Sequence, residues 1–67
     1  MSLYTVIKEI ATKQGKSIYR IERDCGLSNG IVRRWDKSIP RADILQTVAD
    51  YLDVTTSYLL NRAKEEK

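Results

Sequence analysis

The chain has 67 residues and a formal net charge of +3, and 42% of its residues are hydrophobic while 31% are charged. This length is enough for one small domain, which we expect to span residues 1–67, and it leaves no room for a separate catalytic domain. Because histidine is absent and Cys25 is the only cysteine, the composition excludes an internal disulfide and a Cys/His zinc site, so the fold must hold by packing alone.

The first predicted element is an amphipathic helix of about three turns near the N-terminus. Its apolar residues follow the i, i+3, i+4, i+7, i+8 spacing of one helical face: Leu3, Val6, Ile7, Ile10 and Ala11. Gly15 is expected to end this helix.

The second predicted element is a short helix in the segment SIYRIERDC, residues 17–25. Ile18, Ile21 and Cys25 lie three and four residues apart on one face, and Ser17 can cap the helix with its hydroxyl. Gly26 then stops the helix, because the residue just past a helix end usually adopts the left-handed conformation, which glycine enters without steric cost.

The third predicted element is a helix from Ser28 to Trp35. Ser28 is expected to be its N-cap, and Ile31, Val32 and Trp35 form an apolar stripe, which places Trp35 in the core rather than against bases. Two short helices joined by a Gly-containing turn of about four residues are typical of the helix-turn-helix, which sets a recognition helix in the major groove of DNA.

Two further helices are predicted in the C-terminal half. Pro40 breaks the preceding pattern and suits a first helical turn. The apolar stripe of the fourth helix consists of Leu45, Val48, Ala49 and Leu52. Thr55 is expected to cap the fifth helix, with Val54 and Leu59 as a hydrophobic staple, and the charged tail, residues 61–67, is expected to fray. No segment alternates with period two, so the sequence predicts an all-α fold, a compact bundle of five short helices.

Positive charge is concentrated in the third predicted helix and the loop after it. Residues 28–41 contain a single acid, Asp36, and four cations: Arg33, Arg34, Lys37 and Arg41. This stretch therefore carries the same +3 as the whole chain. A confined basic patch is expected of a surface that binds duplex DNA by neutralising phosphates; the alternative is a solvated helix face.

Several classes of protein find little support in the sequence. No apolar run approaches the ~20 residues of a membrane span, and the N-terminus lacks the basic start and apolar centre of a secretion signal. No Gly-rich phosphate loop follows a strand pattern, and no nucleophile stands beside a plausible partner. We therefore expect a cytoplasmic protein that is not an enzyme, has no cofactor or metal and contacts neither a membrane nor a small-molecule ligand.

The helix-turn-helix in the second and third predicted helices is followed by the segment SIPRADILQTVADYLDVTTSYLL. In these two features the chain resembles the lambda repressor-like family of bacterial and phage regulators, also called the Cro/CI or XRE family. The resemblance extends from about Val6 to Leu60 and includes the order and spacing of LSNGIVRRWDKS, IP, VADYLDV and YLL. It implies a transcriptional regulator, often a repressor of phage or mobile-element origin, that binds operator DNA as a dimer.

The resemblance places four residues where family members present side chains to base edges or nearby phosphates: Asn29, Gly30, Arg33 and Arg34. Asn can pair with adenine and Arg with guanine on two atoms, each contact giving about 1–3 kcal/mol of discrimination. Arg34 is the expected base reader, and for Asn29 the alternative is a preference for the first turn of a helix. Gly30 inside a helix costs about 1 kcal/mol relative to alanine. Gly30→Ala is therefore expected to raise thermal stability and to weaken operator binding, unless Gly30 only loosens the helix start.

Contacts to the DNA backbone are expected from six residues: Ser17, Tyr19, Ser28, Lys37, Ser38 and Arg41. Many family members carry Gln at the position of Ile18, where it contacts a phosphate. Because isoleucine cannot make this contact, the role is not assigned to Ile18. Ser17 and the backbone N–H groups beside it can still hold a phosphate at the start of the helix. Arg41 lacks a capping group and opposes the helix dipole at a cost on the order of 1 kcal/mol, so a phosphate contact is expected; the alternative is a plain surface arginine. Glu22 stands where many members have Ala and is expected to pair with a cation.

The sequence thus predicts a sequence-specific regulator that binds double-stranded DNA. One such domain covers too few base pairs to be selective alone, so a homodimer with half-sites about one helical turn apart is expected, with the fifth helix near Tyr58 and Leu60 as the candidate dimer surface. The alternative function is a protein-interaction module of the same fold, antitoxin-like or antirepressor-binding. Its binding would lack a steep salt dependence, and it would expose a large apolar patch.

Overall fold

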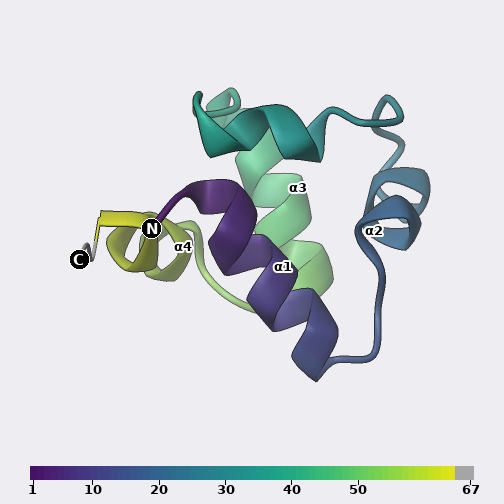
Figure 1. Ribbon diagram of the computed structural model, residues 1–67, viewed down its shortest axis with the longest axis horizontal. Coiled ribbons are helices and arrows are strands. Elements are labelled where there is room, and N and C mark those ends of the chain that lie inside the picture. The colour runs from purple at the N-terminus through teal and green to yellow at the C-terminus, as the bar shows by residue number, and fades with distance from the viewer. Residues whose placement is uncertain (65–67) are drawn as a thin grey trace.

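The computed structural model describes residues 1–64, which form four α-helices and one short 3-10 helix and contain no β-strand (Figure 1). The elements are α1 (Leu3–Lys13), α2 (Ile18–Asp24), the 3-10 helix η1 (Val32–Asp36), α3 (Ala42–Leu52) and α4 (Thr56–Lys64). The all-α prediction is confirmed. The prediction of a bundle of five short helices is corrected: residues 1–64 form four α-helices, and the third predicted helix is a 3-10 helix of five residues.

Serine and threonine side chains begin three of the four α-helices. The Ser2 Oγ accepts a hydrogen bond from the Thr5 N–H at 3.2 Å, and the Ser17 Oγ accepts one from the Arg20 N–H at 3.0 Å. The Thr55 Oγ1 does the same for the Tyr58 N–H at 2.9 Å. Each bond satisfies a backbone donor that has no partner inside its helix. The caps predicted at positions 17 and 55 are therefore confirmed.

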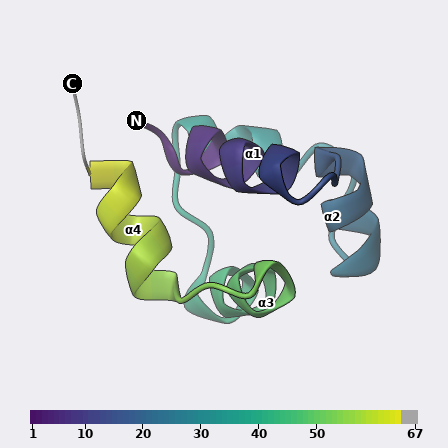
Figure 2. The ribbon, with the colours of Figure 1, turned by 90° about the horizontal axis from the view of Figure 1, so that it is seen from below.

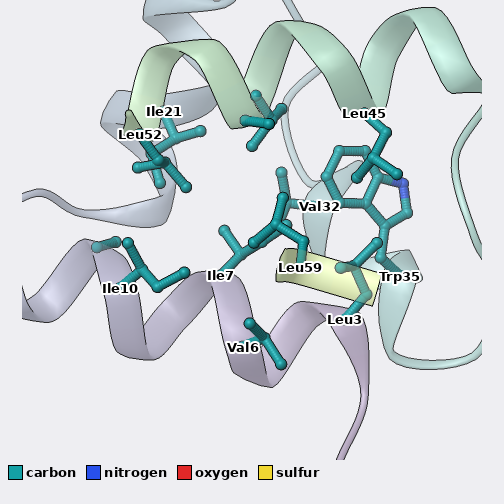
Figure 3. Close-up of a cluster of buried hydrophobic side chains, with 13 residues drawn as sticks. Leu3, Val6, Ile7, Ile10, Ile21, Val32, Trp35, Leu45, Leu52 and Leu59 are labelled. Carbon is teal, nitrogen blue, oxygen red and sulfur yellow. The ribbon is translucent and has the colours of Figure 1, made fainter. Parts of the chain in front are cut away.

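The core is formed where α1, η1, α3 and α4 turn their apolar side chains toward one another (Figure 3). The five apolar residues predicted for the first helical face are all buried. Trp35 is 3% exposed and Val32 is fully buried, so the apolar stripe of the third element faces the core as predicted. Helix α4 contributes Leu59, which is also fully buried. This packing gives η1 one face buried in the core and one face exposed to solvent.

Helix α1 is the centre of the arrangement, since η1, α2 and α4 all pack against it. Viewed from below, α1 lies across from α3, with α2 at one end of the molecule and α4 at the other (Figure 2). Helix α4 continues to Lys64, so residues 61–64 of the tail that was predicted to fray are helical, while residues 65–67 lie outside the described part. No helix within residues 1–64 has the length and apolar character needed to cross a membrane.

A small polar cluster joins α2 to α3. The Tyr51 hydroxyl donates a hydrogen bond to the Asp24 carboxylate, and Arg20 forms an ion pair with the same carboxylate at 3.3 Å. The Lys16 ammonium lies 4.4 Å from the centre of the Tyr51 ring. The hydrogen bond from Tyr51, followed by the bond and the charge of Arg20, lowers the pKa of Asp24 below its ordinary value of 3.8. The ionised form of Asp24 is thus favoured by folding.

This cluster predicts a defined pH dependence of stability. Because the pKa of Asp24 is lower in the folded chain, its stabilisation is present above about pH 3.8 and is lost as the pH falls through the lower, folded value. Asp24→Asn should therefore lower Tm at pH 5 to 7, and its difference from wild type should shrink only below pH 3.8. Thermal unfolding followed by circular dichroism across this range measures the difference, with the exposed Asp50→Asn as control. A difference that persists undiminished to pH 2 would contradict the assignment.

Candidate nucleic-acid interface

The turn between α2 and η1 differs from the predicted helix start. Ser28 does not act as a side-chain cap; its backbone carbonyl accepts a hydrogen bond from the Ile31 N–H at 3.2 Å. Gly30 has φ +87°, which no helix interior allows, so the helical segment begins only at Val32. The prediction of a helix from Ser28 that contains Gly30 is therefore wrong. The left-handed conformation of Gly30 closes the turn before η1 can begin.

Glu22 takes the place of the missing cap. It is 3% exposed, and its two carboxylate oxygens accept hydrogen bonds from the Gly30 N–H and the Val32 N–H, each at 3.0 Å. A buried carboxylate needs such donors, because an unpaired buried charge is strongly unfavourable. The expected pairing of Glu22 with a cation is thus replaced by pairing with the backbone. Through these bonds α2 holds the turn and the first residue of η1.

The outer side of η1 presents the predicted cations. Arg33, Arg34 and Lys37 are exposed, and none of them forms an ion pair with any residue of the described part. Together with Tyr4 and Thr5 of α1 they line an open hollow of about 530 Å³. One acid, Asp36, also lines it. The structure thus brings three of the predicted contact residues together beside the start of α1.

Two other predicted residues meet in a second, smaller hollow. Asn29 and Tyr19 line a depression of about 190 Å³ together with Arg23 and Leu27. Tyr19 is 62% exposed, and Asn29 and Arg23 are exposed as well. Arg23 was not predicted as a site residue. The sequence could have indicated its exposure, because Arg23 follows Ile21 by two residues and so lies on the side of α2 away from the apolar stripe.

The remaining predicted residues line neither hollow. The Ser38 Oγ donates a hydrogen bond to the Arg34 carbonyl at 3.2 Å, which braces the end of η1. Arg41 begins α3 without a side-chain cap, as predicted, and forms an ion pair with Asp43 at 3.1 Å between two well exposed side chains. The charge of Arg41 is thus partly offset by Asp43. Ser17 and Ser28 are exposed, and Ser17 is already engaged as the cap of α2.

The sequence matches no protein-family model, no curated protein and no solved structure. The distinguishing feature of the interface is a 3-10 helix with arginines on its exposed side, whose start is held by one buried carboxylate.

Replacing Glu22 should destabilise the fold and loosen the turn. In Glu22→Gln the side chain keeps one acceptor oxygen but points an amide group at the second backbone donor, which leaves a buried N–H without a partner. We expect a loss of about 1–3 kcal/mol in the free energy of unfolding, measured by urea denaturation. Glu9→Gln is the control, because it removes only the exposed ion pair to Arg62 and should cost far less. Equal losses for the two variants would contradict the role given to Glu22.

Gly30→Ala should lower thermal stability, which reverses the expectation from sequence. A Cβ at this position meets no atom within 4 Å, so the cost comes from backbone conformation alone. A left-handed φ costs an L-residue about 1–2 kcal/mol. Gly30→Asn is the matched control, since asparagine tolerates this region better, and calorimetry should rank wild type above Asn and Asn above Ala. A higher Tm for the Ala variant would show that residue 30 is not held in this conformation.

Proposed function

We propose that the chain is a sequence-specific, double-stranded DNA-binding transcription regulator of the lambda repressor-like kind, in which α2, the Gly30 turn and η1 form the helix-turn-helix. The observation that carries this proposal is a set of three exposed cations, Arg33 and Arg34 of η1 and Lys37 directly after it, which form no ion pair among residues 1–64. Cations left without internal partners are available to phosphates and to guanine edges.

The packing of η1 supports the same function. Val32 and Trp35 are buried beneath it, and Glu22 fixes the residue at its start. The arginine side chains therefore project from a backbone that is held both by the core and by Glu22. A contact made from such a rigid element loses less conformational entropy on binding. Because η1 is only five residues long, base contacts are assigned to the turn as well as the helix: Asn29, Gly30, Arg33 and Arg34.

The proposed complex is a homodimer on operator DNA, with η1 of each protomer in the major groove and half-sites about one helical turn apart. Phosphate contacts are assigned to Lys37 and to the flanking residues Ser17, Tyr19, Ser28, Ser38 and Arg41. The dimer surface is assigned to α4 around Tyr58, which is 42% exposed.

A second candidate function, a protein-interaction module, is favoured by a different surface. A hollow of about 430 Å³ lies between α1 and α4, and Ile10, Val54 and Tyr58 supply apolar lining. A partner protein held there would bind with little dependence on salt. Salt dependence therefore separates the two functions.

The test is the affinity of purified protein for duplexes selected from a random pool, measured between 50 and 300 mM salt. Arg34→Ala should lower affinity for the selected sequence by about 1–3 kcal/mol and relax the preference at one base position. Lys37→Ala should weaken binding to all sequences alike and reduce the slope of log K against log salt by about 0.9. Lys64→Ala, an exposed cation on α4, is the control. No selected sequence, or equal binding by all variants, would refute the proposal.

A further inference from the structure

The hollow beside η1 continues onto the exposed face of α1. A neighbouring hollow of about 530 Å³ shares Thr5 with it and is lined only by α1 residues: Thr5, Lys8, Glu9, Thr12 and Lys13. We call these two adjoining hollows together the α1–η1 trough, which runs from the cations at η1 along α1.

The trough carries a net positive charge. Its lining contains five cations and two acids: Lys8, Lys13, Arg33, Arg34, Lys37, Glu9 and Asp36. Glu9 is already neutralised by Arg62 of α4, whose guanidinium lies 2.9 Å from its carboxylate. Positive charge therefore extends beyond η1 along the whole trough, where it attracts an extended polyanion better than a single anion.

Lys8 and Tyr4 are placed to join the two hollows. The Lys8 ammonium lies 5.9 Å from the centre of the Tyr4 ring, which brings it toward the η1 end of the trough. Lys8 forms no ion pair, and the Tyr4 hydroxyl forms no hydrogen bond, with any residue in the described range. Both groups are donors without an internal acceptor, on the same side as the unpaired cations of η1.

We propose that the α1–η1 trough binds the sugar–phosphate backbone of duplex DNA, with Lys8 and the Tyr4 hydroxyl as phosphate contacts. The inference rests on the proposed function and extends it, because it adds α1 to the surface that touches DNA. Ammonium and hydroxyl donors spaced along a trough fit phosphates, and phosphate contacts fix the orientation of a protein on the duplex without reading its sequence. The trough thus sets how η1 is presented to the groove.

The test compares Lys8→Gln with Lys64→Gln, since both remove one exposed lysine charge from a helix and only the first alters the trough. Affinities for the selected duplex and for an unrelated duplex are measured at several salt concentrations. Lys8→Gln should weaken binding to both duplexes by the same factor, about 3-fold to 10-fold at 100 mM salt, and should lower the salt slope by about 0.9. The ratio of the two affinities should not change. Tyr4→Phe should weaken both to a smaller extent without lowering Tm.

The outcomes separate this inference from the proposed function. If wild type selects a sequence and Lys8→Gln binds as Lys64→Gln does, the trough does not contact DNA while the regulator function stands. If Lys8→Gln changes the sequence preference, the trough reads bases and the assignment to phosphate is wrong. If wild type binds poly-L-glutamate as tightly as duplex of equal charge, the trough takes an acidic polypeptide instead. If wild type binds no duplex, both proposals fall together.

Discussion

The candidate interface depends on one carboxylate. Glu22 leaves α2 on its buried side and accepts hydrogen bonds from the N–H groups of Gly30 and Val32, two donors that lie before or at the first residue of η1. A neutral side chain of similar size has only one acceptor oxygen, whereas a carboxylate has two. The geometry that follows is specific: a left-handed residue, a sharp turn and a 3-10 helix that starts at residue 32. The positions of the exposed arginines on η1 follow from that starting point.

Much of the fold could be predicted because its signals are local. The apolar spacing of residues 3–11 and the caps at Ser17 and Thr55 depend on neighbours three or four residues away, and the structure confirms them. The third helix could not be predicted in the same way. Ser28 is a good N-cap by type, but Gly30 takes a backbone conformation that a helix interior excludes. The hydrogen bonds that fix this turn run from Gly30 and Val32 to Glu22 of α2, eight and ten residues earlier in the chain.

In the candidate site too, the features set by local spacing were predictable and those set by packing between distant elements were not. The apolar stripe of Val32 and Trp35 was enough to predict that Arg33 and Arg34 are exposed, since residues between stripe positions must face away from the core. The neighbours of those arginines were not predictable from spacing. Tyr4 and Thr5 precede them by about 30 residues and meet them only because η1 packs on α1. Likewise, the partnership of Tyr51 with Asp24 follows from how α2 and α3 are placed.

The 3-10 geometry of η1 makes its two adjacent arginines unequal. With about three residues per turn, side chains three positions apart are eclipsed, so the element behaves as a prism with three edges. Val32 and Trp35 share the buried edge, Arg33 shares the second with Asp36, and Arg34 is the one residue of η1 on the third. An α-helix would separate Arg33 and Asp36 by about 60° around its axis. In η1, Arg33 therefore shares its edge with an acid while Arg34 does not, so two arginines that are adjacent in the sequence differ in the charge beside them.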